Sequence, residues 1–173
     1  MSSKALKTID LFAGIGGIRM GFEAAFGDGV ETVFASEFDE HAVKTYAANF
    51  DTPSAPCSSK EPMCSEPYVY GDITQISADD IPPFDICLAG FPCQAFSIAG
   101  SKMGFDDNFK GRSRGTLFFD VLRICERHKP RVIFCENVKG LVMHDKGRTL
   151  KVIKGALEQI GYTVYDAVLN SKD

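Results

Sequence analysis

Strand-like and helix-like patterns alternate along most of the 173-residue chain, and this alternation restricts the fold more than any other feature. Short apolar runs bounded by turn residues predict strands at residues 5–12, 31–36, 68–70, 84–89, 131–135 and 162–169. Apolar residues at helical spacing predict helices at residues 18–26, 39–50, 116–128 and 149–160. Alternation of this kind is typical of α/β proteins, so we expect a doubly wound, mostly parallel sheet with helices on both faces.

Composition narrows the class of protein. Hydrophobic residues make up 45% and charged residues 24% of the sequence, which is typical of a globular domain, and the length suits one domain over residues 1–173. No apolar run approaches the roughly 18 residues that cross a bilayer. The first four residues do not resemble a signal peptide, so we expect a cytoplasmic protein with no membrane partner. The net charge of −4 disfavours nucleic acid as a partner, although residues 102–114 carry four basic side chains.

Two stretches interrupt the alternation of strands and helices. Residues 51–67 are rich in proline and serine, and residues 90–115 form a segment longer than most structureless loops, which predicts a functional loop. Cys57 and Cys64 lie in the first stretch with no histidine nearby, and the sequence contains no CxxC pair, so we expect no metal site. Three other cysteines lie inside apolar runs and are expected to be small buried hydrophobic residues.

A glycine-rich turn follows the first predicted strand. Gly14, Gly16 and Gly17 would permit a tight turn and a close approach of a ligand to the backbone. The dinucleotide pattern GxGxxG is not completed, because Arg19 stands at its last position, so a pyrophosphate is not the expected ligand. The alternative interpretation, a plain strand-to-helix connection, is about equally good.

Acidic residues follow the second and third predicted strands. Glu37 stands where an acid can bind a ribose diol, and its alternative role is a helix-start acid favoured by the helix dipole. Asp72 could accept a hydrogen bond from an adenine amino group, and its alternative role is an N-cap. The glycine turn and the two acids together indicate an adenosine ligand without phosphates, of which S-adenosylmethionine is the common example.

A cysteine and a glutamate follow the fourth and fifth predicted strands. Cys93 lies on a loop and is a candidate nucleophile, although many single cysteines are inert. Glu136 ends an apolar strand, where we expect partial burial and a partner, and it could also bind backbone amides. In the common doubly wound order the fourth strand lies beside the first and the fifth beside the fourth, at spacings of roughly 4.8 Å. Both side chains should therefore meet near the glycine turn.

These segments closely resemble motifs of the cytosine-C5 DNA methyltransferase family. Asp10-Leu-Phe-Ala-Gly-Ile-Gly-Gly17 resembles its first motif, Gly90-Phe-Pro-Cys-Gln-Ala-Phe-Ser97 its catalytic motif, and Glu136-Asn-Val138 its sixth motif. The resemblance covers essentially the whole chain. It implies a Rossmann-like, S-adenosylmethionine-dependent methyltransferase fold.

The resemblance also implies a role for each matching residue. The Cys93 thiolate would add to C6 of cytosine, Glu136 would stabilise the charge that develops on the ring, and Pro92 and Asn137 would order the pocket. Carbon C5 would then accept the methyl group, with S-adenosylhomocysteine as the second product. The expected cofactor-binding residues are Phe12, Gly14, Gly16, Gly17, Glu37, Asp72, Ile73 and Leu117.

The expected partner is double-stranded DNA, from which the target base must be flipped out. By resemblance, Gln94, Ser97 and Arg114 would contact DNA from the loop at residues 90–115. The sequence ends before the family's eighth motif, so we expect a partial catalytic domain without the target-recognition domain and with little activity alone. A complementary chain could carry the missing part.

Three alternatives to a DNA methyltransferase are open. A tRNA cytosine methyltransferase would share the same motifs. A non-catalytic subunit that only binds S-adenosylmethionine would need neither Cys93 nor Glu136. A nicotinamide-dependent oxidoreductase is disfavoured by Arg19 in the glycine-rich turn.

Overall fold

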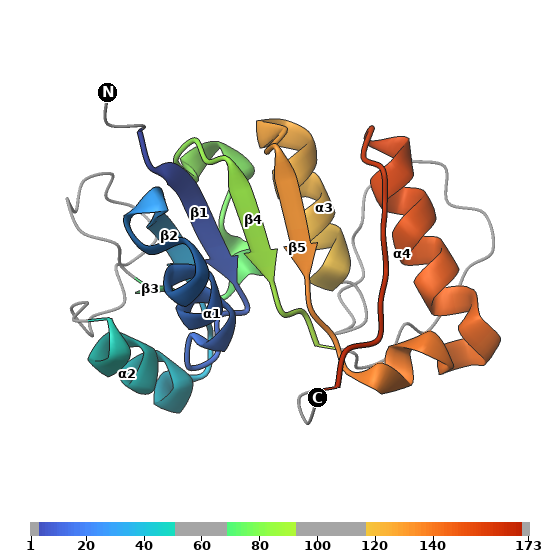
Figure 1. Ribbon diagram of the computed structural model, residues 1–173, viewed down its shortest axis with the longest axis horizontal. Coiled ribbons are helices and arrows are strands. Elements are labelled where there is room, and N and C mark those ends of the chain that lie inside the picture. The colour runs from blue at the N-terminus through green and yellow to red at the C-terminus, as the bar shows by residue number, and fades with distance from the viewer. Residues whose placement is uncertain (1–3, 51–68, 93–116, 171–173) are drawn as a thin grey trace.

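The computed structural model describes residues 4–50, 69–92 and 117–170, which form one sheet with helices around it (Figure 1). The sheet has five strands in the order β3-β2-β1-β4-β5, and every neighbouring pair is parallel. The strands are β1 (Leu6–Leu11), β2 (Val30–Ser36), β3 (Val69–Tyr70), β4 (Ile86–Ala89) and β5 (Val132–Cys135). The predicted parallel sheet is therefore confirmed, as is the placement of the fourth strand beside the first and the fifth beside the fourth.

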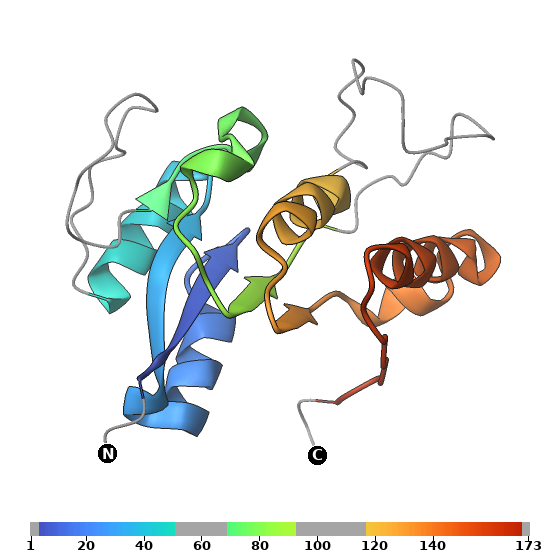
Figure 2. The ribbon, with the colours of Figure 1, turned by 90° about the horizontal axis from the view of Figure 1, so that it is seen from above.

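Four α-helices cover the sheet. They are α1 (Gly17–Phe26), α2 (Glu40–Asn49), α3 (Leu117–His128) and α4 (Arg148–Gln159). Helices α1 and α2 pack on one face, and α3 packs on the other with α4 beside it (Figure 2). The expectation of helices on both faces is confirmed. Short 3-10 helices complete the described elements: η1 (Gly27–Gly29), η2 (Ile73–Gln75), η3 (Ala78–Asp80), η5 (Lys139–Val142) and η6 (His144–Gly147).

The core forms because the central strands bury both of their faces, as parallel strands covered by helices do. All four residues of β4 are buried, and Ile9 and Leu11 of β1 have no exposed surface. Cys87 and Cys125 lie in this core, as predicted, and the contact with the Cys125 thiol together with burial raises the pKa of the Cys87 thiol well above its usual range. Burial also raises the pKa of the Cys135 thiol to about 12, so these thiols are structural rather than reactive.

The sheet ends at β5, whose outer side chains are open to solvent. Val132 is 48% exposed and Phe134 is 42% exposed, although the Phe134 ring meets the edge of the Phe22 ring of α1 at a centroid distance of 5.1 Å. Helix α1 contains no buried residue, which is unusual for a helix that packs on a sheet. The face formed by α1 and β5 is thus only partly covered by the described residues.

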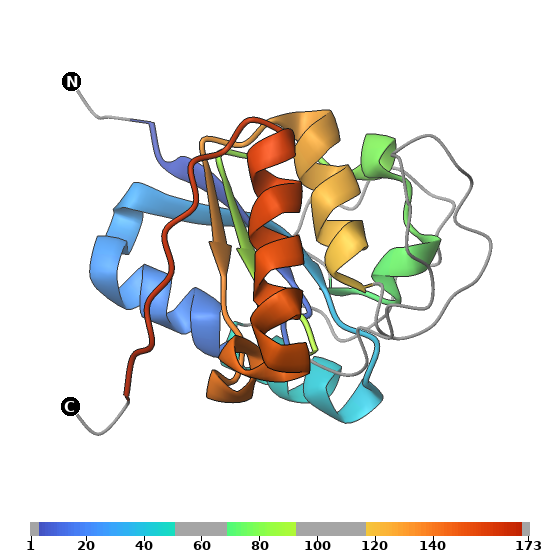
Figure 3. The ribbon, with the colours of Figure 1, turned by 90° about the vertical axis from the view of Figure 1, so that its right-hand side faces the viewer.

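The predicted strand at residues 162–169 is wrong. This segment is extended, but it joins no strand, and it runs beside α4 (Figure 3). Tyr165 is 89% exposed and Leu169 is 88% exposed, whereas Val164 is half-buried and packs against the apolar cluster of α3 and α4. A strand needs a neighbour for its hydrogen bonds, and here the segment is held instead by an ion pair between Asp166 and Lys154.

Among residues 4–50, 69–92 and 117–170, no helix combines the length and the hydropathy that crossing a bilayer requires. The other predicted elements differ from the observed ones by one or two residues at their ends, which is the usual uncertainty of helix and strand limits. Asp39 is the N-cap of α2, because its carboxylate accepts hydrogen bonds from the amides of His41 and Ala42.

Candidate functional site

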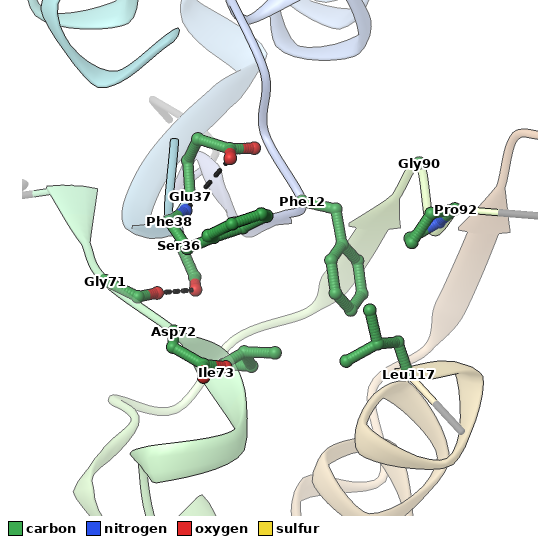
Figure 4. Close-up of a pocket in the computed structure, with 10 residues that line it drawn as sticks. All are labelled: Phe12, Ser36, Glu37, Phe38, Gly71, Asp72, Ile73, Gly90, Pro92 and Leu117. Carbon is green, nitrogen blue, oxygen red and sulfur yellow. Dashed lines mark hydrogen bonds between the residues drawn. The ribbon is translucent and has the colours of Figure 1, made fainter. Parts of the chain in front are cut away.

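A pocket lies at the carboxyl ends of the central strands, the edge where ligands bind in open α/β sheets (Figure 4). The rings of Phe12 and Phe38 stand on two sides of it, with Asp72 and Ile73 below. The pocket is lined by Phe12, Ser36, Glu37, Phe38, Gly71, Asp72, Ile73, Gly90, Pro92 and Leu117. Six of these residues were predicted from the sequence, and the structure adds Ser36, Phe38, Gly71 and Gly90.

The glycine-rich turn bends the backbone away from β1 and into α1. Gly14 and Gly16 have φ angles of 53° and 91°, in the left-handed region that favours glycine. A Cβ atom on Gly16 would lie 2.2 Å from the Phe50 ring and 3.2 Å from the Tyr46 ring. Gly16 therefore lets the turn close against α2, whereas a Cβ on Gly17 would meet open space.

Phe12 also adopts a left-handed conformation, with a φ of 56°. This conformation is costly for an aromatic residue, and such strain is often found at functional sites. Figure 4 shows that the Phe12 ring points into the pocket toward Leu117. The ring can offer a flat apolar face to a ligand, which agrees with the role expected for Phe12.

Glu37 braces the pocket from the end of β2. Its Oε2 atom accepts a hydrogen bond of 2.9 Å from the Gly14 amide. Its Oε1 atom accepts hydrogen bonds of 2.9 and 2.8 Å from the amides of Phe38 and Asp39. Because a carboxylate has about four acceptor positions, one position on Oε2 is left for a ligand hydroxyl. Glu37 thus ties the glycine-rich turn to the start of α2 and can also bind a ribose.

Asp72 follows β3 and fulfils its alternative role as an N-cap. Its carboxylate accepts a hydrogen bond of 2.9 Å from the Thr74 amide and so caps η2. The preceding residue, Gly71, is fixed by the Ser36 hydroxyl, which donates a hydrogen bond of 2.7 Å to its carbonyl oxygen. The cap leaves the exposed side of Asp72 lining the pocket beside the buried Ile73.

Glu136 and Asn137 follow β5, next to the end of β4. The Glu136 amide donates a hydrogen bond of 3.0 Å to Ala89, and a Cβ on Gly90 would lie 3.7 Å from Glu136 Oε2. The Glu136 carboxylate therefore lies close to Gly90. The expected partial burial of Glu136 is wrong: the residue is exposed, because β5 is the edge strand and no described residue covers it.

Asn137 connects the end of β5 to the segment after β4. Its side-chain amide donates a hydrogen bond of 2.7 Å to the Phe91 carbonyl, and its Oδ1 atom accepts one of 2.9 Å from the Val138 amide. Phe91 is buried and Pro92, the next residue, lines the pocket. The predicted Cys93, Gln94, Ser97 and Arg114 lie outside the described residues.

Asp10, which was not predicted as a functional residue, is a buried carboxylate at the end of β1 before the glycine-rich turn. Asp10 is 1% exposed, and neither of its oxygens has a hydrogen-bond partner among the described residues. Burial raises the pKa of Asp10 to about 7, and the nearby Tyr46 hydroxyl and Arg19 act in the opposite direction. The sequence offered one sign of this buried acid, because Asp10 is the single charged residue in the apolar run of residues 9–13.

Arg19 occupies the space between α1 and α2 above Asp10. Its guanidinium donates a hydrogen bond of 3.1 Å to the Tyr46 hydroxyl and one of 2.6 Å to Glu23, and it lies 3.8 Å from the centre of the Phe50 ring. Arg19, which breaks the dinucleotide pattern in the sequence, is thus a structural residue that joins the two helices. In the part of the chain that the structure describes, no group of three or more His, Cys, Asp or Glu could hold a metal ion.

The parallel sheet and the pocket at the ends of its central strands define a Rossmann-like α/β protein. A structure of a DNMT2 variant from Spodoptera frugiperda has this fold, with a TM-score of 0.61 and 22% identity, covering 90% of this chain and 41% of that chain. The family model described as C-5 cytosine-specific DNA methylase matches residues 6–173. The chain therefore belongs to the C-5 cytosine-specific DNA methylase family.

Relatives within the family are considerably closer than this structural neighbour. The type II methyltransferase M.NlaX of Neisseria lactamica is 54% identical over 167 residues, which cover 96% of this chain and 47% of the relative. The type II methyltransferase M.HaeII of Haemophilus aegyptius is 50% identical over 170 residues, which cover 98% of this chain and 46% of the relative. The chain thus spans about half the length of these curated relatives.

Proposed function

We propose that this chain is the cofactor-binding and catalytic part of an enzyme that transfers a methyl group from S-adenosylmethionine to C5 of cytosine in double-stranded DNA. The observation that carries the proposal is the convergence of Phe12, Glu37 and Asp72 on one pocket from the ends of three adjacent strands. The family to which the chain belongs and the type II relatives support DNA as the substrate.

The chemistry of the pocket fits an adenosine ligand without phosphates. The described lining residues include two aromatic rings and two carboxylates but neither Lys nor Arg, and the carboxylates would repel a phosphate. Phe12 and Phe38 would contact the adenine, Glu37 a ribose hydroxyl, and Asp72 with Ile73 the adenine edge. When bound, S-adenosylmethionine supplies an electrophilic methyl group on its sulfonium.

The protein's own residues would activate the cytosine. The Cys93 thiolate adds to C6 of a flipped-out base, which makes C5 nucleophilic toward the methyl group. Glu136 hydrogen bonds to the ring at N3 and the exocyclic amine and stabilises the charge that develops as the thiolate adds. After methyl transfer, a base removes the C5 proton and Cys93 is expelled. Asn137 holds the backbone at Phe91, two residues before Cys93, and so positions the nucleophile.

We further propose that this chain needs a complementary segment that carries the target-recognition part, from the same polypeptide or from a second chain. The exposed apolar side chains of Val132, Phe134 and Val138 at β5 support this, since exposed apolar surface of this kind marks interaction sites. Alone, the chain would methylate DNA poorly. The bacterial relatives and a DNA substrate support a cytoplasmic location.

A tRNA cytosine methyltransferase is the closest alternative, since it would use the same chemistry. The description of the family favours DNA, and methyl transfer assays on duplex DNA and tRNA with the complete enzyme would separate the two substrates. A subunit that only binds the cofactor would have no use for Glu136. The Glu136 carboxylate lies beside Gly90 at the end of β4 and does not line the cofactor pocket.

Calorimetric titration of the chain with S-adenosylhomocysteine tests the cofactor site. We expect binding by the unchanged chain and at least about tenfold weaker binding by Glu37→Ala, because the variant loses both the ribose acceptor and the brace on Gly14. Glu40→Ala is the matched control, since it removes an exposed acid from the same helix start without touching the pocket. Equal affinities of the two variants, or tighter binding of NAD, would refute the assignment.

A further inference from the structure

Positive charge exceeds negative charge in several stretches of this acidic chain, and one of these stretches directly follows Glu136, Asn137 and Val138. Residues 139–154, here called the basic segment, carry five Lys or Arg side chains and one acidic side chain, whereas the whole chain has a net charge of −4. Four of the five basic residues are exposed: Lys139, Lys146, Arg148 and Lys151. A basic cluster of this kind is the electrostatic signature of a surface that binds a polyanion.

The basic segment begins beside the proposed catalytic edge. Lys139 is three residues after Glu136, and three residues of extended chain span at most roughly 11 Å. Elements η5 and η6, drawn in orange, lie on the side of the sheet where the strands end, and α4 runs back from there (Figure 1). The basic segment is therefore close enough to Glu136 to contact the backbone of a nucleic acid whose base enters the site.

The basic residues of α4 do not lie at positions where they would stabilise the helix. Arg148 and Lys151 occupy the first turn, at the positive end of the helix dipole, and this turn contains no acidic residue. Together with Lys154 they follow one another at a spacing of three residues on the same face, where like charges repel. Asp145 pairs with Arg148 and Asp166 pairs with Lys154, but Lys139 and Lys151 form no ion pair with any described residue.

The turn before α4 is held in a fixed conformation. Asp145, Lys146 and Gly147 have left-handed φ angles of 49°, 57° and 81°. The turn is anchored by a contact of 2.7 Å between His144 Nδ1 and the hydroxyl of the buried Thr149, and by the ion pair from Asp145. Because these contacts order the backbone, binding through the exposed Lys146 would cost side-chain entropy but little backbone entropy.

We propose that the basic segment binds the sugar–phosphate backbone of duplex DNA next to the flipped-out cytosine, without reading its sequence. Lys and Arg contacts to phosphates position a duplex but carry no sequence information. This inference rests on the proposed function, which makes duplex DNA the substrate. Under this proposal, residues 139–154 contact DNA in addition to the target-recognition part and to residues 93–116.

The test is the salt dependence of binding between the 173-residue chain and a short fluorescent DNA duplex, measured by anisotropy. The variant Lys139→Gln/Lys151→Gln is compared with Lys129→Gln/Arg131→Gln, which removes the same charge at the opposite end of β5. Each lost phosphate contact lowers the slope of log K against log salt by about 0.9, so the first variant should lose about 1.8 and the control almost nothing.

Equal effects of the two double variants, no effect of either, or no duplex binding by the unchanged chain would overturn the proposal. Binding of tRNA but not of duplex DNA would overturn it in favour of an RNA surface. The same samples are titrated with S-adenosylhomocysteine. If S-adenosylhomocysteine does not bind but the salt slopes of the two double variants differ as expected, the proposed function is refuted and the phosphate-binding surface is supported. If S-adenosylhomocysteine binds but the slopes do not differ, the phosphate-binding surface is refuted and the proposed function is unaffected.

Discussion

The side-chain amide of Asn137 lies 2.7 Å from the carbonyl oxygen of Phe91 and joins the segment that follows β4 to the segment that follows β5, which contains the proposed acid Glu136. Phe91 is 4% exposed, so water cannot readily replace this hydrogen bond. The contact explains how residues that are 46 positions apart in sequence are held in register at the edge of the sheet.

Replacement of Asn137 by Asp should destabilise the fold. The substitution keeps the size of the side chain but removes the donor to Phe91, which costs about 1–3 kcal/mol for a buried acceptor. Asn49→Asp is the control, because Asn49 donates an equivalent bond of 2.8 Å to Ile15 at an exposed position. Urea denaturation should show that Asn137→Asp lowers the free energy of unfolding clearly more than Asn49→Asp does. Similar decreases for the two variants would contradict the structural role of the Asn137–Phe91 hydrogen bond.

Alanine at Gly16 should damage the turn, whereas alanine at Gly17 should be tolerated. The new Cβ at position 16 would meet the Phe50 ring, and overpacking of this kind costs about 1–3 kcal/mol. Gly17 is the first residue of α1 and has open space around it. Thermal melting measures the loss of stability, and titration with S-adenosylhomocysteine measures the loss of binding. If Gly16→Ala melts and binds as the unchanged chain does, the close packing of the turn on α2 is not real.

The buried Asp10 should make the protein less stable as the pH rises. Its pKa in the fold is raised to about 7 from a value near 3.8, so the folded state holds a proton that the unfolded state has released. The stability that this proton provides is present below pH 3.8 and is lost as the pH rises through about 7. A difference of this size corresponds to roughly 4 kcal/mol.

Asp10→Asn resembles the neutral acid and should remove that part of the pH dependence. We expect the variant to be more stable than the unchanged chain at pH 8 and similar to it at pH 4, as measured by urea denaturation at each pH. Asp28→Asn, at an exposed position, should leave the pH profile unchanged. A profile for Asp10→Asn that is as steep as that of the unchanged chain would show that Asp10 is not the group responsible.

Cys93 should be needed for chemistry but not for cofactor binding. In the complete enzyme, Cys93→Ser should form no covalent complex with a duplex that contains 5-fluorocytosine, yet bind S-adenosylhomocysteine as before. Cys57→Ser, in the proline-rich stretch, should leave both properties intact. Gel electrophoresis under denaturing conditions detects the complex, and a persistent complex with Cys93→Ser would exclude this residue as the nucleophile.

The sequence was most informative at the strand ends. Buried parallel strands produce strong apolar runs, and the polar residues that follow them, such as Glu37 and Asp72, are where the sheet topology requires a ligand site. Strand order followed from the common doubly wound arrangement and was confirmed. The parts of the fold that depend on local pattern and short connections were therefore predictable.

The errors arose where a residue's environment depends on distant segments. The apolar run within residues 162–169 predicts a strand, but no described strand pairs with it. Glu136 was expected to be partly buried, but at the end of an edge strand it is exposed. Asp10 was missed because its burial results from packing against distant segments, and the groups near it, Tyr46 and Arg19, come from two different helices. Periodicity in the sequence cannot report such long-range contacts.

A crystal structure of this chain with S-adenosylhomocysteine would test the central claim most directly. Our account predicts that the adenine lies between Phe12 and Phe38 with its edge toward Asp72, and that a ribose hydroxyl contacts the free acceptor position of Glu37 Oε2. Ligand density anywhere other than the ends of β1, β2 and β3, or an empty pocket at saturating ligand, would contradict the account.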